Sequence, residues 1–232
     1  MKQLYKAALL ATLGLAAATV ANAETYGDFI AGFTTQSGND QLVDIGNIAT
    51  LVNGESWTAT QLGISASSVS SYSWGIIGDA SKSDGIAGTS STYDTIWSTS
   101  LVVPSTATEG TFGYFDSGVN SILASFPGGQ YDTNPGNQLS IASSADNSWN
   151  IQTINGTLTT DIVNSFGNPN TTGATSDPIW QVTANASGPV ELGEFTLNNA
   201  GTLTYTVPEP SAYALLTMAG VVVVTLRNKF RK

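Results

Sequence analysis

Two apolar segments bracket this chain and limit what can fold between them. The first covers residues 7–20 and the second residues 212–226, and six of the seven basic residues flank these two runs. An apolar run with basic residues beside it is typical of a segment that enters a membrane or an export pathway. We therefore expect one folding unit over residues 24–206. A unit of this size can bury a core without disulfides, which matters because the chain has no cysteine.

Residues 1–23 have the three parts of a secretory signal peptide. A short basic start precedes the apolar run, and that run, at fourteen residues, is short for a membrane anchor. The chain then continues with Ala21, Asn22 and Ala23, which puts small residues at the two positions that signal peptidase reads. We predict cleavage after Ala23, with Glu24 as the new first residue. An uncleaved anchor is the alternative.

Residues 207–232 also have three parts. The first is an extended motif that its prolines hold out of the helical region, made up of Val207, Pro208, Glu209, Pro210 and Ser211. The apolar run 212–226 would span about 22 Å as a helix, slightly less than a hydrocarbon core. Basic side chains at its end can snorkel to cover the difference: Arg227, Lys229, Arg231 and Lys232. The pattern predicts a single transmembrane helix whose basic end, 227–232, stays cytoplasmic.

This order of motif, apolar helix and basic end resembles the PEP-CTERM sorting signal, which is also described as the ice-binding protein C-terminal domain. The resemblance implies recognition by an exosortase-type enzyme, cleavage near Pro208–Pro210 and an exopolysaccharide-producing Gram-negative source. Residues 27–33, 72–78 and 192–197 also resemble parts of PEP-CTERM ectodomains, but that likeness implies no biochemical activity. The alternative is a permanent single-span anchor after a proline hinge.

The charge of the central region excludes one class of partner. Sixteen acidic residues lie between Glu24 and Glu194, and Lys82 is the only basic residue there, so the region carries a net charge of −15. Such a surface repels phosphate backbones, and we expect no binding of nucleic acid.

Short apolar or alternating runs between turn-forming clusters predict a mainly β ectodomain, β-sandwich-like, with a few short helices. The expected strands cover residues 28–34, 41–45, 48–52, 72–77, 95–103, 139–142, 149–154, 179–183, 191–197 and 202–207. Within the strand at 95–103, the continuous apolar run at 101–103 fits a sandwich interior. Apolar residues at helical spacing predict a helix ending near Phe126, before Pro127 and two glycines. Weaker patterns suggest helices at 60–70 and 161–166.

The residue inventory limits the possible chemistry. The chain has no histidine and no cysteine, which excludes triads based on these residues, thiolate nucleophiles and the usual zinc sites. We expect no catalytic residues, no metal and no cofactor, and we interpret the protein as a non-enzyme. A glycoside hydrolase needs only two carboxylates at the correct separation. Its candidate acids would be Asp44, Glu55, Asp116, Asp132, Glu191 and Glu194.

Five tryptophans leave a second possibility open. Trp74, Trp97, Trp149 and Trp180 lie in strand-like runs and are expected in the core, whereas Trp57 lies in a polar stretch and is the best candidate for exposure. The leading hypothesis is a non-catalytic exported protein of the cell envelope or extracellular matrix, first anchored in the inner membrane. Its partners would be signal peptidase and an exosortase-type enzyme. The alternatives are a module that binds exopolysaccharide and a secreted glycoside hydrolase.

Overall fold

The computed structural model describes residues 28–47, 50–80, 94–104, 109–123, 125–126, 136–155, 169–185 and 188–207. Strands make up 46% of the structure and helices 16%, so the predicted mainly β class with few short helices is confirmed. Both terminal segments, the predicted signal peptide and the predicted sorting tail, lie outside the described residues. Within the described ranges, no helix is both long enough and apolar enough to span a membrane.

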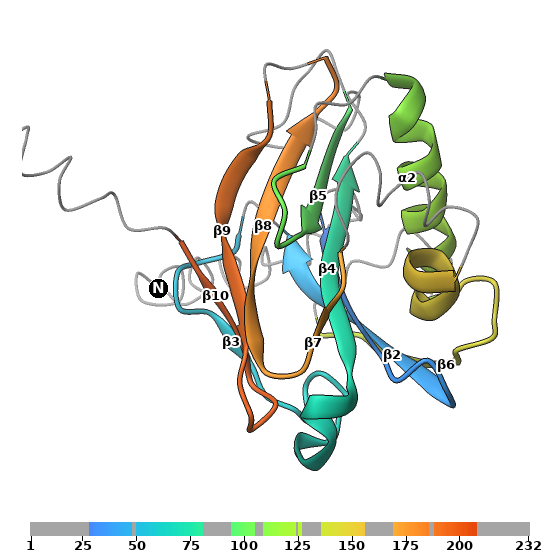
Figure 1. Ribbon diagram of the computed structural model, residues 1–232, viewed down its shortest axis with the longest axis vertical. Helices are drawn as coiled ribbons and strands as arrows, with labels where there is room; N and C mark the ends of the chain where they lie inside the picture. The colour runs from blue at the N-terminus through green and yellow to red at the C-terminus, as the bar shows by residue number, and fades with distance from the viewer. Residues whose placement is uncertain are drawn as a thin grey trace, which may run out of the picture.

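The described strands form one antiparallel sheet (Figure 1). In chain order they are β1 (Asp28–Thr34), β2 (Asn39–Asn47), β3 (Ser56–Trp57), β4 (Ser73–Ala80), β5 (Thr95–Thr99), β6 (Gln138–Ala142), β7 (Thr171–Thr172), β8 (Thr175–Thr183), β9 (Val190–Leu197) and β10 (Leu203–Thr206). Their order across the sheet is β3-β10-β9-β8-β5-β4-β1-β2-β6, and β7 pairs with β4 beside this path. β3 and β6 are therefore the two edges.

The sheet curls strongly, and its concave side holds the larger core. Phe29 on β1 contacts Phe195 on β9 with ring centroids 6.1 Å apart, although β4, β5 and β8 separate these strands in the sheet. Both rings belong to one buried cluster that also includes Val43 of β2 and Leu203 of β10. The two ends of the sheet thus approach each other across an aromatic interior.

A helix and a short helical turn cover part of the convex side. Helix α2 (Glu109–Leu123) lies alongside β4 and β5 (Figure 1). Its Phe112, Phe115, Val119 and Ile122 pack with Trp149 and the outward side chains of the sheet in a second core. Since β1 lies between the two cores, all seven of its residues are buried.

Most predicted strands are confirmed, with changed ends. The prediction of a strand at 149–154 is wrong, because residues 149–155 are helical and end in the π-helix η3 (Ile151–Asn155). Polar caps outweigh the alternating pattern: the Ser148 hydroxyl accepts the Ile151 N–H at 3.2 Å, and the Asp40 carboxylate accepts the Asn150 N–H at 2.7 Å. Residues 50–52 are also not in a strand, and the sequence pattern missed β3 and β7.

The expectation that residues 101–103 lie in an interior is wrong as well. Strand β5 ends at Thr99, and Leu101, Val102 and Val103 are 65%, 71% and 60% exposed. Ser100 turns the chain out of the sheet: its hydroxyl donates to the Val102 carbonyl at 2.7 Å and accepts the Val102 N–H at 3.2 Å.

The predicted helix near Phe126 is confirmed as α2, which begins at Glu109, earlier than the spacing indicated. Of the weaker predictions, the segment 60–70 contains only a 3₁₀ helix, η1 (Ala66–Ser71). The segment 161–166 lies outside the described residues.

Candidate functional site

A cleft of about 330 Å³ lies between the two edges of the curled sheet. One wall comes from the region of β3, with Trp57 and the flanking loops, and the other from β6 and the end of β2. The lining residues are Ile45, Gly46, Thr50, Glu55, Trp57, Gln61, Gly136 and Gln138. We call this hollow the seam cleft.

Within the described residues, β3 and β6 do not pair, and a side chain links the two edges beside the seam cleft. Gln138 at the start of β6 donates from Nε2 to the carbonyls of Thr60 at 2.9 Å and Gln61 at 2.8 Å. These two carbonyls follow β3 in the chain. The bridge thus links the two edges beside the seam cleft.

Hydrogen bonds also orient the other polar side chains of the cleft. Gln61 Oε1 accepts from the Thr58 backbone N–H at 2.9 Å and from its hydroxyl at 2.8 Å. Glu55 Oε2 accepts the Val52 N–H at 3.1 Å. The Thr50 hydroxyl donates to the Asn47 carbonyl at 2.9 Å. The cleft is therefore lined by side chains that their own loops already hold in place.

Trp57 forms the aromatic part of the wall, in a way that the sequence did not predict. It is only 7% exposed, and its ring lies 6.3 Å from the ring of Phe195 in the concave core. The expectation of an exposed Trp57 is therefore wrong, although the residue does line the cleft.

The other four tryptophans form no sugar-stacking platform. Trp74, Trp97 and Trp149 are fully buried, as predicted. Trp180 was also expected in the core but is only half-buried, and its indole N–H donates to the Ser100 carbonyl at 2.9 Å.

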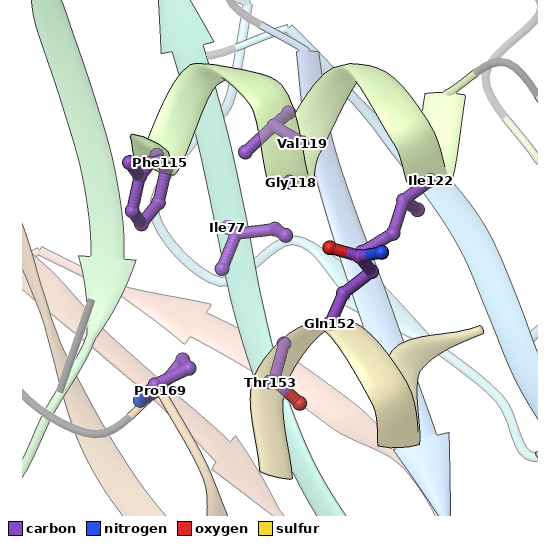
Figure 2. A pocket seen from close by; sticks show the side chains of 8 residues that line it. All are labelled: Ile77, Phe115, Gly118, Val119, Ile122, Gln152, Thr153 and Pro169. Atoms are coloured by element: carbon purple, nitrogen blue, oxygen red, sulfur yellow. The ribbon is translucent and has the colours of Figure 1, made fainter. Parts of the chain in front are cut away.

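A second cavity lies under α2, and Figure 2 shows its lining. Gln152 points from η3 toward α2, between Ile77 and Ile122 (Figure 2). Its buried Oε1 has no hydrogen-bond partner among the described residues. The cavity volume is about 10 Å³, and a single water needs at least about 10–15 Å³. This cavity is too small for a ligand.

Buried carboxyl groups are the main electrostatic feature. Burial, with a smaller contribution from the nearby Asp44 carboxylate, raises the pKa of Asp28 to about 7, while a hydrogen bond from Asn47 opposes this shift. Burial alone raises the pKa of Asp177 to about 7, and neither of its oxygens has a hydrogen-bond partner in the described ranges. The described residues include no lysine or arginine, so none of them can form an ion pair with these acids.

Of the six candidate acids of a hydrolase, the structure describes the side chains of four, and these lie at three different places in the fold. Glu55 lines the seam cleft, Asp44 is buried on β2, and Glu191 and Glu194 lie exposed on β9. The side chain of Asp116 and the whole of Asp132 lie outside the described residues. In the part of the chain that the structure describes, no group of three potential metal-binding side chains occurs.

The residues of the two predicted processing sites fall mostly outside the description. Only Val207 of the sorting motif is described, and the signal-cleavage residues and the basic end are not.

Comparison with protein-family models found no match. The search of curated proteins gave no match, and neither did the search of solved structures. The sequence had no signal for Gln61 and Gln138, because their role depends on how the sheet edges meet.

Proposed function

We propose that this protein is an exported, non-catalytic component of the cell envelope or extracellular matrix. Signal peptidase removes residues 1–23, and an exosortase-type enzyme recognises the motif at 207–211. Residues 212–226 hold the precursor in the inner membrane as a single transmembrane helix before processing. The ectodomain, 24–206, is sandwich-like in that the two ends of its curled sheet face each other, and it acts as a structural or adhesive unit.

The position of the last described strand is the observation that carries this proposal. The last strand, β10, ends at Thr206, immediately before the sorting motif. Val207 is 43% exposed, and its N–H donates to the side-chain oxygen of Asn53 at 3.0 Å. The fold thus anchors the chain just ahead of Pro208 and leaves Val207 at the surface. A processing enzyme could then act on the motif without unfolding β10.

The composition of the core supports a structural role. The two cores are aromatic and aliphatic. The neighbouring carboxyl groups of Asp28 and Asp44 are both buried, and Glu191 and Glu194 lie exposed on β9. Catalysis by paired carboxylates needs two such groups on either side of a reacting bond.

Intact-mass measurement of the protein recovered from its host tests this proposal, with and without the exosortase-type enzyme. We expect a chain that begins at Glu24 and that lacks the residues after the Pro208–Pro210 region only when the enzyme is present. A mature protein that retains residues 208–232 would defeat the sorting proposal in favour of a plain anchor. Substitution of Pro208 and Pro210 by alanine should have the same effect as loss of the enzyme.

A module that binds exopolysaccharide is the second candidate function. The seam cleft favours it, because the cleft combines an aromatic wall with orienting polar side chains, as small-molecule sites do. The buried tryptophans count against a flat stacking platform, so any sugar would have to bind in the cleft.

A further inference from the structure

We propose that the seam cleft is a binding site for a neutral sugar residue, held by hydrogen bonds to its hydroxyl groups. This inference deepens the second candidate function by naming the ligand class, and it does not depend on the sorting proposal. It rests on the size, polarity and charge of the cleft.

The bonds already present in the cleft determine what its side chains can offer a ligand. Gln61 uses its amide oxygen on Thr58, so its N–H groups are the donors it can present. Gln138 uses Nε2 on two carbonyls, so its oxygen is the acceptor it can present. The Thr50 hydroxyl donates its hydrogen bond to the Asn47 carbonyl, so its oxygen can accept one from a ligand. The cleft therefore presents a donor and several acceptors.

A hydroxyl group matches this mixture, because each one donates one hydrogen bond and accepts others. A ligand that only accepts would leave the acceptors of Gln138 and Thr50 unmatched, and unmatched buried polar groups reduce affinity. Polyhydroxyl compounds, above all sugars, satisfy donors and acceptors together.

The charge of the lining selects a neutral ligand over an anionic one. Among the described lining residues, Glu55 is the only charged one and none is basic. An anionic sugar would face this carboxylate without a compensating cation, and like charges in a cleft repel strongly.

Size and the aromatic wall fit the same ligand class. A volume of about 330 Å³ is near the lower end of the range for small-molecule sites, which begins at about 300 Å³. Trp57 and Ile45 give the cleft an apolar side against which the C–H groups of a sugar ring can pack. The Trp57 ring packs against the Phe195 ring of the concave core, so this wall is already in place before a ligand binds.

Titration calorimetry on the full-length chain tests the inference, in a detergent without a sugar headgroup. The probes are maltohexaose and mannohexaose, with oligogalacturonate as the anionic counterpart. We expect saturable binding of at least one neutral probe and much weaker binding of oligogalacturonate. Failure of both neutral probes to bind at millimolar concentration, or tighter binding of the anionic probe, would overturn the proposal.

A pair of isosteric variants assigns the binding to the cleft. Gln61→Glu keeps the acceptor for Thr58 but removes the N–H donors, so neutral binding should weaken by about tenfold or more. Gln36→Glu makes the same change on the exposed turn between β1 and β2 and should leave binding unchanged. Equal affinities of Gln61→Glu and Gln36→Glu would place the sugar elsewhere and refute the site. Thermal melts of both variants establish that each remains folded.

Glu55→Gln tests the charge argument separately. The amide oxygen of glutamine can still accept the Val52 N–H, so the loop should keep its shape. We expect this variant to bind oligogalacturonate more tightly than the parent does. Unchanged discrimination would show that Glu55 does not select the ligand charge. The sorting proposal is unaffected by any of these results, because its test is the mass of the processed chain.

Discussion

The indole ring of Trp149 occupies the space beside the Gly32 backbone where any other residue at position 32 would place its Cβ. Gly32 lies in the middle of β1, and Trp149 begins the helical segment that packs on that strand. Ring and strand backbone are therefore in direct contact in the second core. A Cβ at this position would lie far inside van der Waals distance of a fully buried ring.

The first prediction follows from this contact. Gly32→Ala should lower the free energy of unfolding by about 3 kcal/mol or more, because the core must move to admit one methyl group. Urea denaturation followed by tryptophan fluorescence measures the loss. Stability equal to the parent would show that Trp149 can leave the strand without cost.

Substitution of Gly113 is a matched control that should change the stability in the opposite direction. Gly113 is exposed in α2, and a Cβ added there meets nothing within 4 Å. Gly113→Ala should raise stability by about 0.5–1 kcal/mol, because glycine is entropically unfavourable inside a helix. Together, the two substitutions separate a close contact from the general effect of replacing glycine.

Local signals in the sequence predicted some elements, whereas contacts between residues far apart in the sequence determined others. Strands such as β1 were predictable because their residue types and flanking turns act locally. The segment 149–155 was not, since its alternating pattern fits a strand. Its helix depends on a hydrogen bond to Asp40 of β2, a residue far away in the sequence. The exposed run at 101–103 was misassigned because one hydroxyl, that of Ser100, ends β5.

The second prediction concerns Asp177, a fully buried carboxyl on β8. Its pKa is about 7 in the fold, against an ordinary value of 3.8. Because the fold favours the protonated form, ionisation opposes folding. Stability should therefore be highest below pH 4, decrease as the pH rises toward 7 and stay low above it. A difference of about three pKa units corresponds to a few kcal/mol.

Asp177→Asn removes this dependence, because the amide does not ionise. We expect the variant to be more stable than the parent at pH 8 and to have a flatter stability profile between pH 4 and pH 7. Glu191→Gln removes the same charge from an exposed position on β9 and serves as the control. If both variants shift the profile equally, net charge and not the burial of Asp177 is the cause.

The third prediction concerns Asp28, whose pKa is raised to about 7 by burial and secondly by Asp44. Asp44→Asn should lower the pKa of Asp28, although not to 3.8, because burial remains. Asn at position 44 can still accept the Gly46 N–H that Asp44 accepts at 2.8 Å. Asn47→Ala should raise the pKa of Asp28, because it removes the side-chain N–H that donates to the carboxylate. Carboxyl-carbon NMR titration measures both shifts, and changes of the opposite sign would contradict the assigned causes.

Only part of the seam cleft could be predicted from the sequence. Trp57 was singled out from the sequence for its polar surroundings, and it does line the cleft, although it is buried. Gln61 and Gln138 are far apart in the chain and belong to no motif. They meet because the sheet curls until its edges approach, and the degree of curl depends on packing across the whole concave core.

The final prediction tests whether the Gln138 bridge holds the sheet edges together. Gln138→Met keeps the length of the side chain but removes both N–H donors, leaving the carbonyls of Thr60 and Gln61 to water. We expect a loss of about 1–2 kcal/mol, since each hydrogen bond contributes about 1 kcal/mol net. Amide hydrogen exchange should also become faster at Leu62 and Ile64, whose N–H groups bond within this loop. Gln36→Met is the control, and exchange rates equal in the two variants would mean that the edges stay together without the bridge.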